Sequence, residues 1–192
     1  MNKKTKQEDI LETALLLFSE HGYHAVGIDR IIAEAKIAKM TLYKYFPSKE
    51  LLIESVLLKR DSLLRASILE AVNKASDPIH KLKAIFDWYE VWFKSIQFHG
   101  CMFIRASEEF PDAKSNIRTI SQNHKMWLTE LMQESLEEIG VESPLEVASH
   151  LLVILDGLTV KLTMFDSPVV NQTEIAWKYT KQVIESSVSL PS

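Results

Sequence analysis

Glycine and proline divide this 192-residue chain into segments of helical length. Only five glycines and six prolines occur, which is too few for the many tight turns of an all-β protein. No stretch between them shows the sustained alternation of apolar and polar residues that marks a half-buried strand. The chain is therefore predicted to be all-α, with about nine helices. The breaks lie at Gly22, Gly27, Pro47, Pro78, Gly100, Pro111, Gly140, Pro144 and Pro168.

The helices that we expect between these breaks follow from apolar periodicity and from the residues that cap helix ends. Ser48 is an expected N-cap, Pro78 suits the first turn of the fifth helix, and Asp112 is expected to cap the long seventh helix. The predicted spans are residues 6–21, 28–35, 39–45, 49–75, 78–98, 102–110, 112–140, 144–165 and 172–187.

Composition places the chain among soluble globular proteins, with 46% apolar and 25% charged residues. A single cysteine, Cys101, excludes an intrachain disulfide and fits a reducing compartment. The longest aliphatic run, residues 151–155, is far shorter than a membrane span, and residues 1–9 do not resemble a signal peptide. We therefore expect a cytoplasmic protein without membrane contact.

Charge is distributed unevenly although the net charge is −4. Residues 1–50 carry eight basic and seven acidic side chains, whereas residues 51–192 carry 14 and 19. Five of the eight basic residues lie between Arg30 and Lys49. Because a local positive cluster matters more for nucleic-acid binding than net charge, the acidic pI does not exclude a DNA-binding role. We expect one domain over residues 1–50 and a second over residues 51–192.

The first domain contains a candidate helix-turn-helix, in which the second short helix would enter the DNA major groove. In that helix, Leu42 and Phe46 lie one turn apart and are expected to anchor it inward. The side chains left to face outward include no acid and can contact phosphates and base edges. They are Lys39, Thr41, Tyr43, Lys44 and Tyr45. Pattern alone also allows a plain solvated helix face.

Residues 10–52 resemble the DNA-binding domain of TetR-family transcriptional regulators. The similar segments are residues 10–14, 17–23, 31–35 and 41–52. The last of these, Thr-Leu-Tyr-Lys-Tyr-Phe-Pro-Ser-Lys-Glu-Leu-Leu, is the most specific. Residues 100–103 and 109–112 also resemble the ligand domain of one large subgroup.

This resemblance implies roles for individual residues. It places Lys39, Met40 and Tyr43 near base edges. Phosphate contacts are implied for Thr41, Lys44, Tyr45 and Lys49, the last at a helix N-terminus that favours anions.

Three positions depart from the family pattern. Gly27 replaces a capping Ser or Thr, so only backbone N–H groups remain there for a phosphate. Lys36 replaces a turn glycine, which implies either a left-handed backbone costing on the order of 1 kcal/mol or a reshaped turn, and adds a charge near DNA. Met40 replaces a common glycine and is expected to alter base preference.

The eighth predicted helix is apolar nearly all round, so it must be covered on more than one side. A central helix in a monomer satisfies this requirement, as does a helix shared between its own domain and a second copy. The resemblance favours the second alternative, a homodimer through the last two helices on a palindromic operator.

The fifth and sixth predicted helices are rich in aromatic residues. The resemblance implies a pocket for a small, largely apolar effector among the fourth to seventh helices, although an aromatic stripe is also typical of plain core. If Arg105 lined the pocket and did not pair with Glu108 or Glu109, a carboxylate or phenolate effector would be favoured. The expected lining is Phe86, Tyr89, Phe93, Phe103, Arg105, His124 and Trp127.

No motif for catalysis, a cofactor or a metal stands out. Cys101 lies near His99 in sequence, which does not by itself make a nucleophile and base. His21 and His24 lack an evident third ligand for zinc. We therefore expect a non-enzymatic, effector-released repressor that binds double-stranded DNA. The alternatives are a small-molecule-binding protein or enzyme with a purely structural helix-turn-helix, and a helical scaffold for protein partners.

Overall fold

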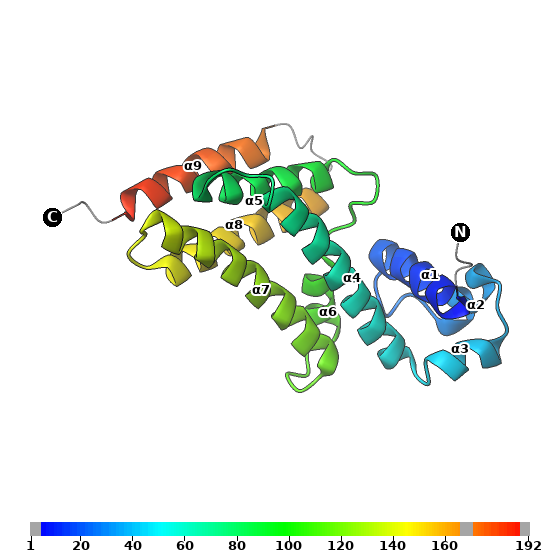
Figure 1. The fold of residues 1–192 in the computed structure, drawn as a ribbon. Coiled ribbons are helices and arrows are strands. Elements are labelled where there is room, and N and C mark those ends of the chain that lie inside the picture. Colours follow the sequence, from blue (N-terminus) through cyan, green and yellow to red (C-terminus); the bar gives the residue numbers. More distant parts are fainter. Residues whose placement is uncertain (1–4, 166–170, 189–192) are drawn as a thin grey trace. The chain divides into compact units, whose positions relative to one another are not determined.

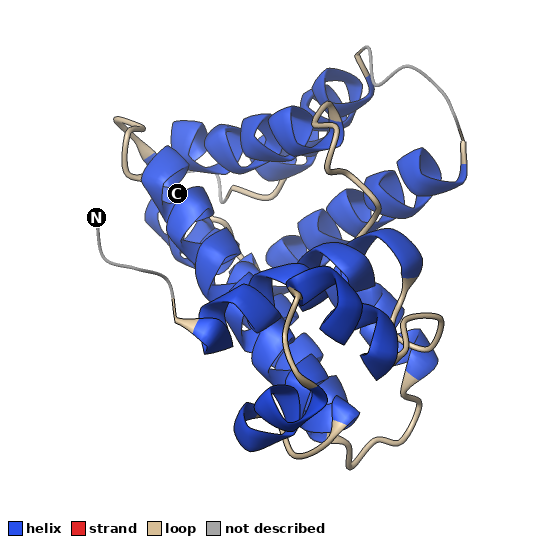
Figure 2. Cartoon of the chain, turned by 90° about the vertical axis from the view of Figure 1, so that its right-hand side faces the viewer, coloured by secondary structure: helices blue, strands red, loops and turns tan. Residues whose placement is uncertain are grey.

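The computed structural model describes residues 5–165 and 171–188, and this part of the chain is helical almost throughout (Figures 1 and 2). Its β-structure is one isolated antiparallel bridge between Val141 and Val188. The all-α prediction is confirmed. The helices are α1 (Lys6–His21), α2 (Ile28–Ala35), α3 (Lys39–Tyr45), α4 (Lys49–Val72), α5 (Pro78–Phe93), α6 (Met102–Glu109), α7 (Asn116–Ile139), α8 (Pro144–Met164) and α9 (Gln172–Ser186).

Side-chain caps mark the starts of α1, α4 and α5. The Ser48 hydroxyl accepts a hydrogen bond from the Leu51 N–H at 3.1 Å, and the Asp77 carboxylate accepts one from the His80 N–H at 3.0 Å. The predicted cap at Asp112 is wrong, because α7 begins at Asn116. The Asp112 side chain instead accepts from the Lys114 N–H at 3.0 Å, the local turn that a short carboxylate favours over helix.

The described chain forms two compact units. The first contains the residues up to Leu63 together with Cys101–His124, and the second contains Leu64–Gly100 and the chain from Lys125 onward. The chain passes from one unit to the other within α4, within α7 and at the Gly100–Cys101 peptide. The functional division expected at residue 50 stays a prediction.

In the first unit, the three N-terminal helices pack on one another (Figure 1). Lys59 of α4 donates a hydrogen bond to the Glu12 carboxylate of α1 at 3.5 Å. A capping box starts α1, because the Thr5 hydroxyl accepts from the Glu8 N–H and the Glu8 carboxylate accepts from the Thr5 N–H. The apolar residues that form the core of this unit are fully or almost fully buried. Its residues include Ile10, Ala14, Leu17, Phe18, Tyr23, Ile31, Leu42, Phe46, Leu52, Val56 and Phe103.

In the second unit, α5, α8 and α9 pack together around a large apolar cluster that also takes in residues from α4 and α7. Gly100, at the edge of this unit, has φ +85°, and a Cβ there would lie 2.8 Å from the Thr163 hydroxyl of α8. By length and composition alone, α8 is apolar enough to cross a membrane. Only 28% of its most apolar window is buried within the chain, so much of its apolar surface is uncovered.

Candidate nucleic-acid interface

The turn between α2 and α3 fixes how the second helix is presented. Lys36 ends α2 in the left-handed conformation, with φ 52° and ψ 47°. Its N–H donates to the Ala33 carbonyl at 3.3 Å, and the Ile37 N–H donates to the Ile32 carbonyl at 3.2 Å. This pair of bonds is a Schellman motif, which glycine usually completes. Of the two outcomes expected at Lys36, the structure has the strained left-handed backbone.

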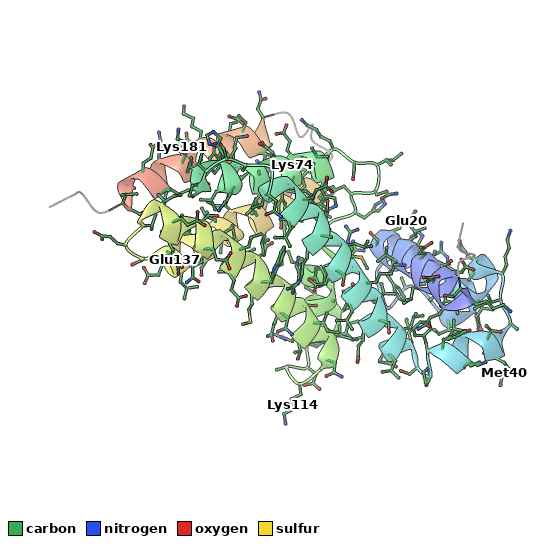
Figure 3. The ribbon with its side chains drawn as sticks, viewed as in Figure 1. Glu20, Met40, Lys74, Lys114, Glu137 and Lys181 are labelled. Atoms are coloured by element: carbon green, nitrogen blue, oxygen red, sulfur yellow. The ribbon has the colours of Figure 1, made fainter. Side chains whose placement is uncertain are left out.

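The outer face of α3 carries the residues that the sequence placed there. Leu42 and Phe46 are buried in the core of the first unit, as predicted, and anchor the inner face of α3. Met40 is 80% exposed at the surface of α3 (Figure 3). Five side chains of the helix are exposed and Thr41 is half-buried. The exposed residues are Lys39, Met40, Tyr43, Lys44 and Tyr45.

Lys39 has a partner that sequence reasoning missed. Its ammonium donates to the Asp29 carboxylate of α2 at 3.1 Å, and both side chains are exposed. The hydrogen bond to Asp29, and then its charge, raise the pKa of Lys39 above its ordinary value. Asp29 therefore holds Lys39 charged, but it also places one acid beside the face that would meet DNA. No local spacing rule links these residues, because the turn brings them together.

The starts of α2 and α4 also belong to this unit. Gly27 is the N-cap of α2 without a side-chain cap, and a Cβ there would meet nothing within 4 Å. Lys49, half-buried, is the first residue of α4 and follows the capping Ser48. Free backbone N–H groups at helix starts suit phosphate oxygens. The DNA-contact roles of Gly27, Lys36 and Lys49 stay predictions.

The residues expected to line an effector pocket are divided between the two units. Phe86, Tyr89 and Phe93 lie in the buried cluster of the second unit. Trp127, in the same unit, is half-buried beneath the Arg65 guanidinium, 4.8 Å from its ring centroid.

The other three expected pocket residues, Phe103, Arg105 and His124, belong to the first unit. The rings of Phe103 and His124 stack with centroids 3.9 Å apart, and the His124 Nδ1 lies 2.8 Å from an Asp61 carboxylate oxygen. Arg105 donates to the Ser19 carbonyl. The role of all seven residues as a pocket stays a prediction.

An open groove of about 480 Å³ runs between α7 and α8 of the second unit, and none of the seven lines it. Its lining is Lys125, Met126, Thr129, Glu130, Gln133, Leu145, Ser149 and Leu152. Among the described residues, no three His, Cys, Asp or Glu side chains gather closely enough to hold a metal ion.

A sequence profile described as "Bacterial regulatory proteins, tetR family" matches residues 10–56, which contain α1 to α3 and the start of α4. The crystal structure of a TetR-family transcriptional regulator from Streptomyces coelicolor matches with a TM-score of 0.89 at 27% identity, over 96% of each chain. The chain belongs to the TetR family.

Relatives of this TetR-family protein match over different shares of the chain. The HTH-type transcriptional regulator YuxN of Bacillus subtilis is 48% identical over 75 residues, which span 39% of this chain and about a quarter (26%) of YuxN. The HTH-type transcriptional repressor KstR2 of Mycobacterium tuberculosis is 25% identical over 140 residues, or 70% of this chain and 68% of KstR2. The helix-turn-helix of this TetR-family protein is thus the DNA-binding element of a transcriptional regulator.

Proposed function

We propose that this TetR-family regulator is a repressor that binds a palindromic operator as a homodimer and releases it when a small, largely apolar effector binds. The observation that carries the proposal is the outer face of α3. It presents lysine, tyrosine and methionine side chains to solvent, while Leu42 and Phe46 hold the helix rigidly from below. Such a face can satisfy phosphates and read base edges in the major groove.

The uncovered surface of α8 supports a homodimer. Val153, Val160 and Met164 are exposed apolar residues that recur along one side of the helix, with Gly157 between them. Among the described residues, nothing lies within 4 Å of where a Cβ of Gly157 would be, so their packing does not require glycine there. Glycine inside a helix costs about 0.5–1 kcal/mol relative to alanine. Close approach of a helix from a second copy would give this glycine a purpose.

α9 offers a second apolar stripe for the same contact. Ile175, Tyr179 and Val183 are exposed and four residues apart, so they share one face. Two copies related by a two-fold axis would present two α3 helices, about 34 Å apart on successive major grooves, to a palindromic site.

Effector control requires a second arrangement of the dimer with a different spacing of the α3 helices. α4 is suited to linking the two, because it begins at Lys49 in the first unit and ends in the second. An effector shifts the population only if it binds the two arrangements with different affinity. The aromatic core around Tyr89 and Phe93 supports a largely apolar effector.

The proposal is tested by selecting genomic DNA fragments with the purified protein and sequencing them. We expect a two-fold-symmetric site. Fragment enrichment that is no better than random, from folded protein at low and moderate salt, refutes the proposal.

A matched pair of variants then tests the face of α3. Lys44→Ala and Lys114→Ala each remove one exposed positive charge, the second from the loop before α7. Lys44→Ala should weaken operator binding and lower the slope of log K against log salt by about 2 for the dimer, because each lost phosphate contact lowers it by about 1. Lys114→Ala should leave both unchanged. Equal behaviour of the two variants contradicts the placement of DNA on α3.

A further inference from the structure

One carboxylate holds the corner between α1 and α2. The Glu109 Oε1 accepts a hydrogen bond from the Tyr23 N–H at 3.0 Å, and its Oε2 accepts from the His24 N–H at 2.6 Å. Both donors are backbone groups just beyond the end of α1, where no helical partner is available. Glu109 lies 85 or more residues further along the chain, in the last turn of α6. The corner therefore depends on α6 for its hydrogen bonds.

α6 also carries a positively charged side chain, which bonds to backbone carbonyls of the same corner. Arg105 lies one turn before Glu109, and its Nη1 donates to the Ser19 carbonyl at 2.8 Å and to the Phe18 carbonyl at 3.3 Å. These carbonyls belong to the last turn of α1, which carries the negative end of the helix dipole. Arg105 and Glu109 thus match the carbonyls and the amides of one corner with a cation and an anion.

The start of α6 is joined to the same corner. The Tyr23 side chain is fully buried, and its hydroxyl donates to the Met102 carbonyl at 2.9 Å. Gly22, beside it, has φ +85°, and a Cβ at this position would lie 2.8 Å from the Glu109 carboxylate. α6 is therefore fixed to the corner at both of its ends, and a side chain at Gly22 would displace the Glu109 carboxylate.

The corner leads directly into the helix-turn-helix. α2 begins at Ile28, four residues after His24, and α3 follows it through the turn at Lys36. Because α6 is bonded to the α1–α2 corner, it helps to fix where α2 and α3 begin.

We propose that Arg105 and Glu109 are positioning residues for DNA recognition, which hold the α1–α2 corner and thereby the orientation of α2 and α3. They touch no DNA themselves and act through the α1–α2 corner. This inference rests on the proposed function and adds to it two residues outside the helix-turn-helix on which selectivity for the operator depends.

Glu109→Gln is the informative change, since an amide offers one oxygen acceptor where the carboxylate offers two. Glu108→Gln is the matched control, because it removes the same charge from the exposed neighbouring residue of the same helix. Full-length proteins are compared by circular dichroism, by hydrogen exchange at the Tyr23 and His24 amides, and by affinity for the selected operator and for random DNA.

In Glu109→Gln, we expect exchange at the two amides to accelerate at least tenfold. The ratio of operator to random-DNA affinity should fall about tenfold, while random-DNA affinity stays within twofold of wild type. A merely structural role would lower both affinities together. Glu108→Gln should behave like wild type.

Equal operator-to-random ratios in the Glu109→Gln and Glu108→Gln proteins overturn the inference. If Glu109→Gln does not fold, Arg105→Lys takes its place, since lysine keeps the charge but loses the guanidinium geometry. An unchanged ratio in Arg105→Lys likewise overturns it. A wild-type protein without sequence selectivity refutes the proposed function together with this inference, whereas a selective wild type with unaltered variants refutes this inference alone.

Discussion

Lys36 is a site where one substitution should stabilise the protein. Its backbone is left-handed, at φ 52° and ψ 47°, and its side chain is exposed. The hydrogen bonds that close the turn come from the backbone N–H groups of Lys36 and Ile37, so they do not depend on the side chain. Lys36→Gly therefore removes the steric strain and keeps the turn, because glycine adopts this conformation readily.

The gain can be estimated from two opposing terms. A side chain in the left-handed conformation costs about 1–2 kcal/mol. Glycine has more conformational freedom in the unfolded chain, and this lowers the gain in the free energy of unfolding by about 0.5–1 kcal/mol. The net expectation for Lys36→Gly is a gain of about 1 kcal/mol, which raises Tm by about 2–4 °C in a chain of this length.

Lys36→Ala separates the backbone from the charge, since alanine keeps a Cβ and therefore the strain. Thermal unfolding followed by circular dichroism, at one fixed protein concentration, should show Lys36→Ala close to wild type and Lys36→Gly above both. If Lys36 contacts phosphate, the two variants should lose the same amount of operator affinity. A Lys36→Gly protein no more stable than Lys36→Ala would refute the strain argument.

Three other changes have defined outcomes. Asp29→Asn removes the acid beside Lys39 and should raise operator affinity about two- to fivefold in fluorescence anisotropy. Lys39 has an ordinary pKa of 10.5, which Asp29 raises, so Lys39 is charged from about pH 6 to 9 and the gain in affinity should be constant there. A strong pH dependence of this gain argues against the prediction. Tyr23→Phe leaves the Met102 carbonyl without its buried donor and should cost about 1–3 kcal/mol in thermal unfolding. Burial raises the pKa of Tyr23 above its ordinary 10.0, so the wild type should lose stability as pH rises above about 10 and the variant should lack this slope; the same slope in both contradicts the assignment. Val153→Glu should give monomers in analytical ultracentrifugation, whereas Val91→Glu, at an equally exposed position of α5, should remain dimeric; a dimeric Val153→Glu protein places the interface elsewhere.

Much of the fold could be predicted because its signals are local. In the described chain, every glycine and proline except Gly157 lies at or between helix ends, and the predicted N-cap Ser48 caps α4. The burial of Leu42 and Phe46 could be predicted because residues four apart share one helix face. Asp112 was mispredicted because a capping helix start and a local turn have the same sequence signal, and only the surrounding packing selects between them.

The candidate site divides along the same line. The donor-rich face of α3 follows from seven consecutive residues, so the sequence reveals it. The pairing of Asp29 with Lys39, of Asp61 with His124 and of Glu109 with the α1–α2 corner joins residues that are ten, 63 and 85 or more positions apart. No periodicity connects them, and the carboxylates look like ordinary solvated acids until the fold brings a partner to them.

The sequence by itself determined the helix order and the helix-turn-helix, because helix periodicity acts within a few residues. Only the tertiary structure decided which carboxylates are bonded, how α6 holds the corner next to α2, and how much of α8 remains uncovered. Those features depend on which surfaces meet across long separations in the chain, and the free energy of burying and pairing them belongs to no single segment.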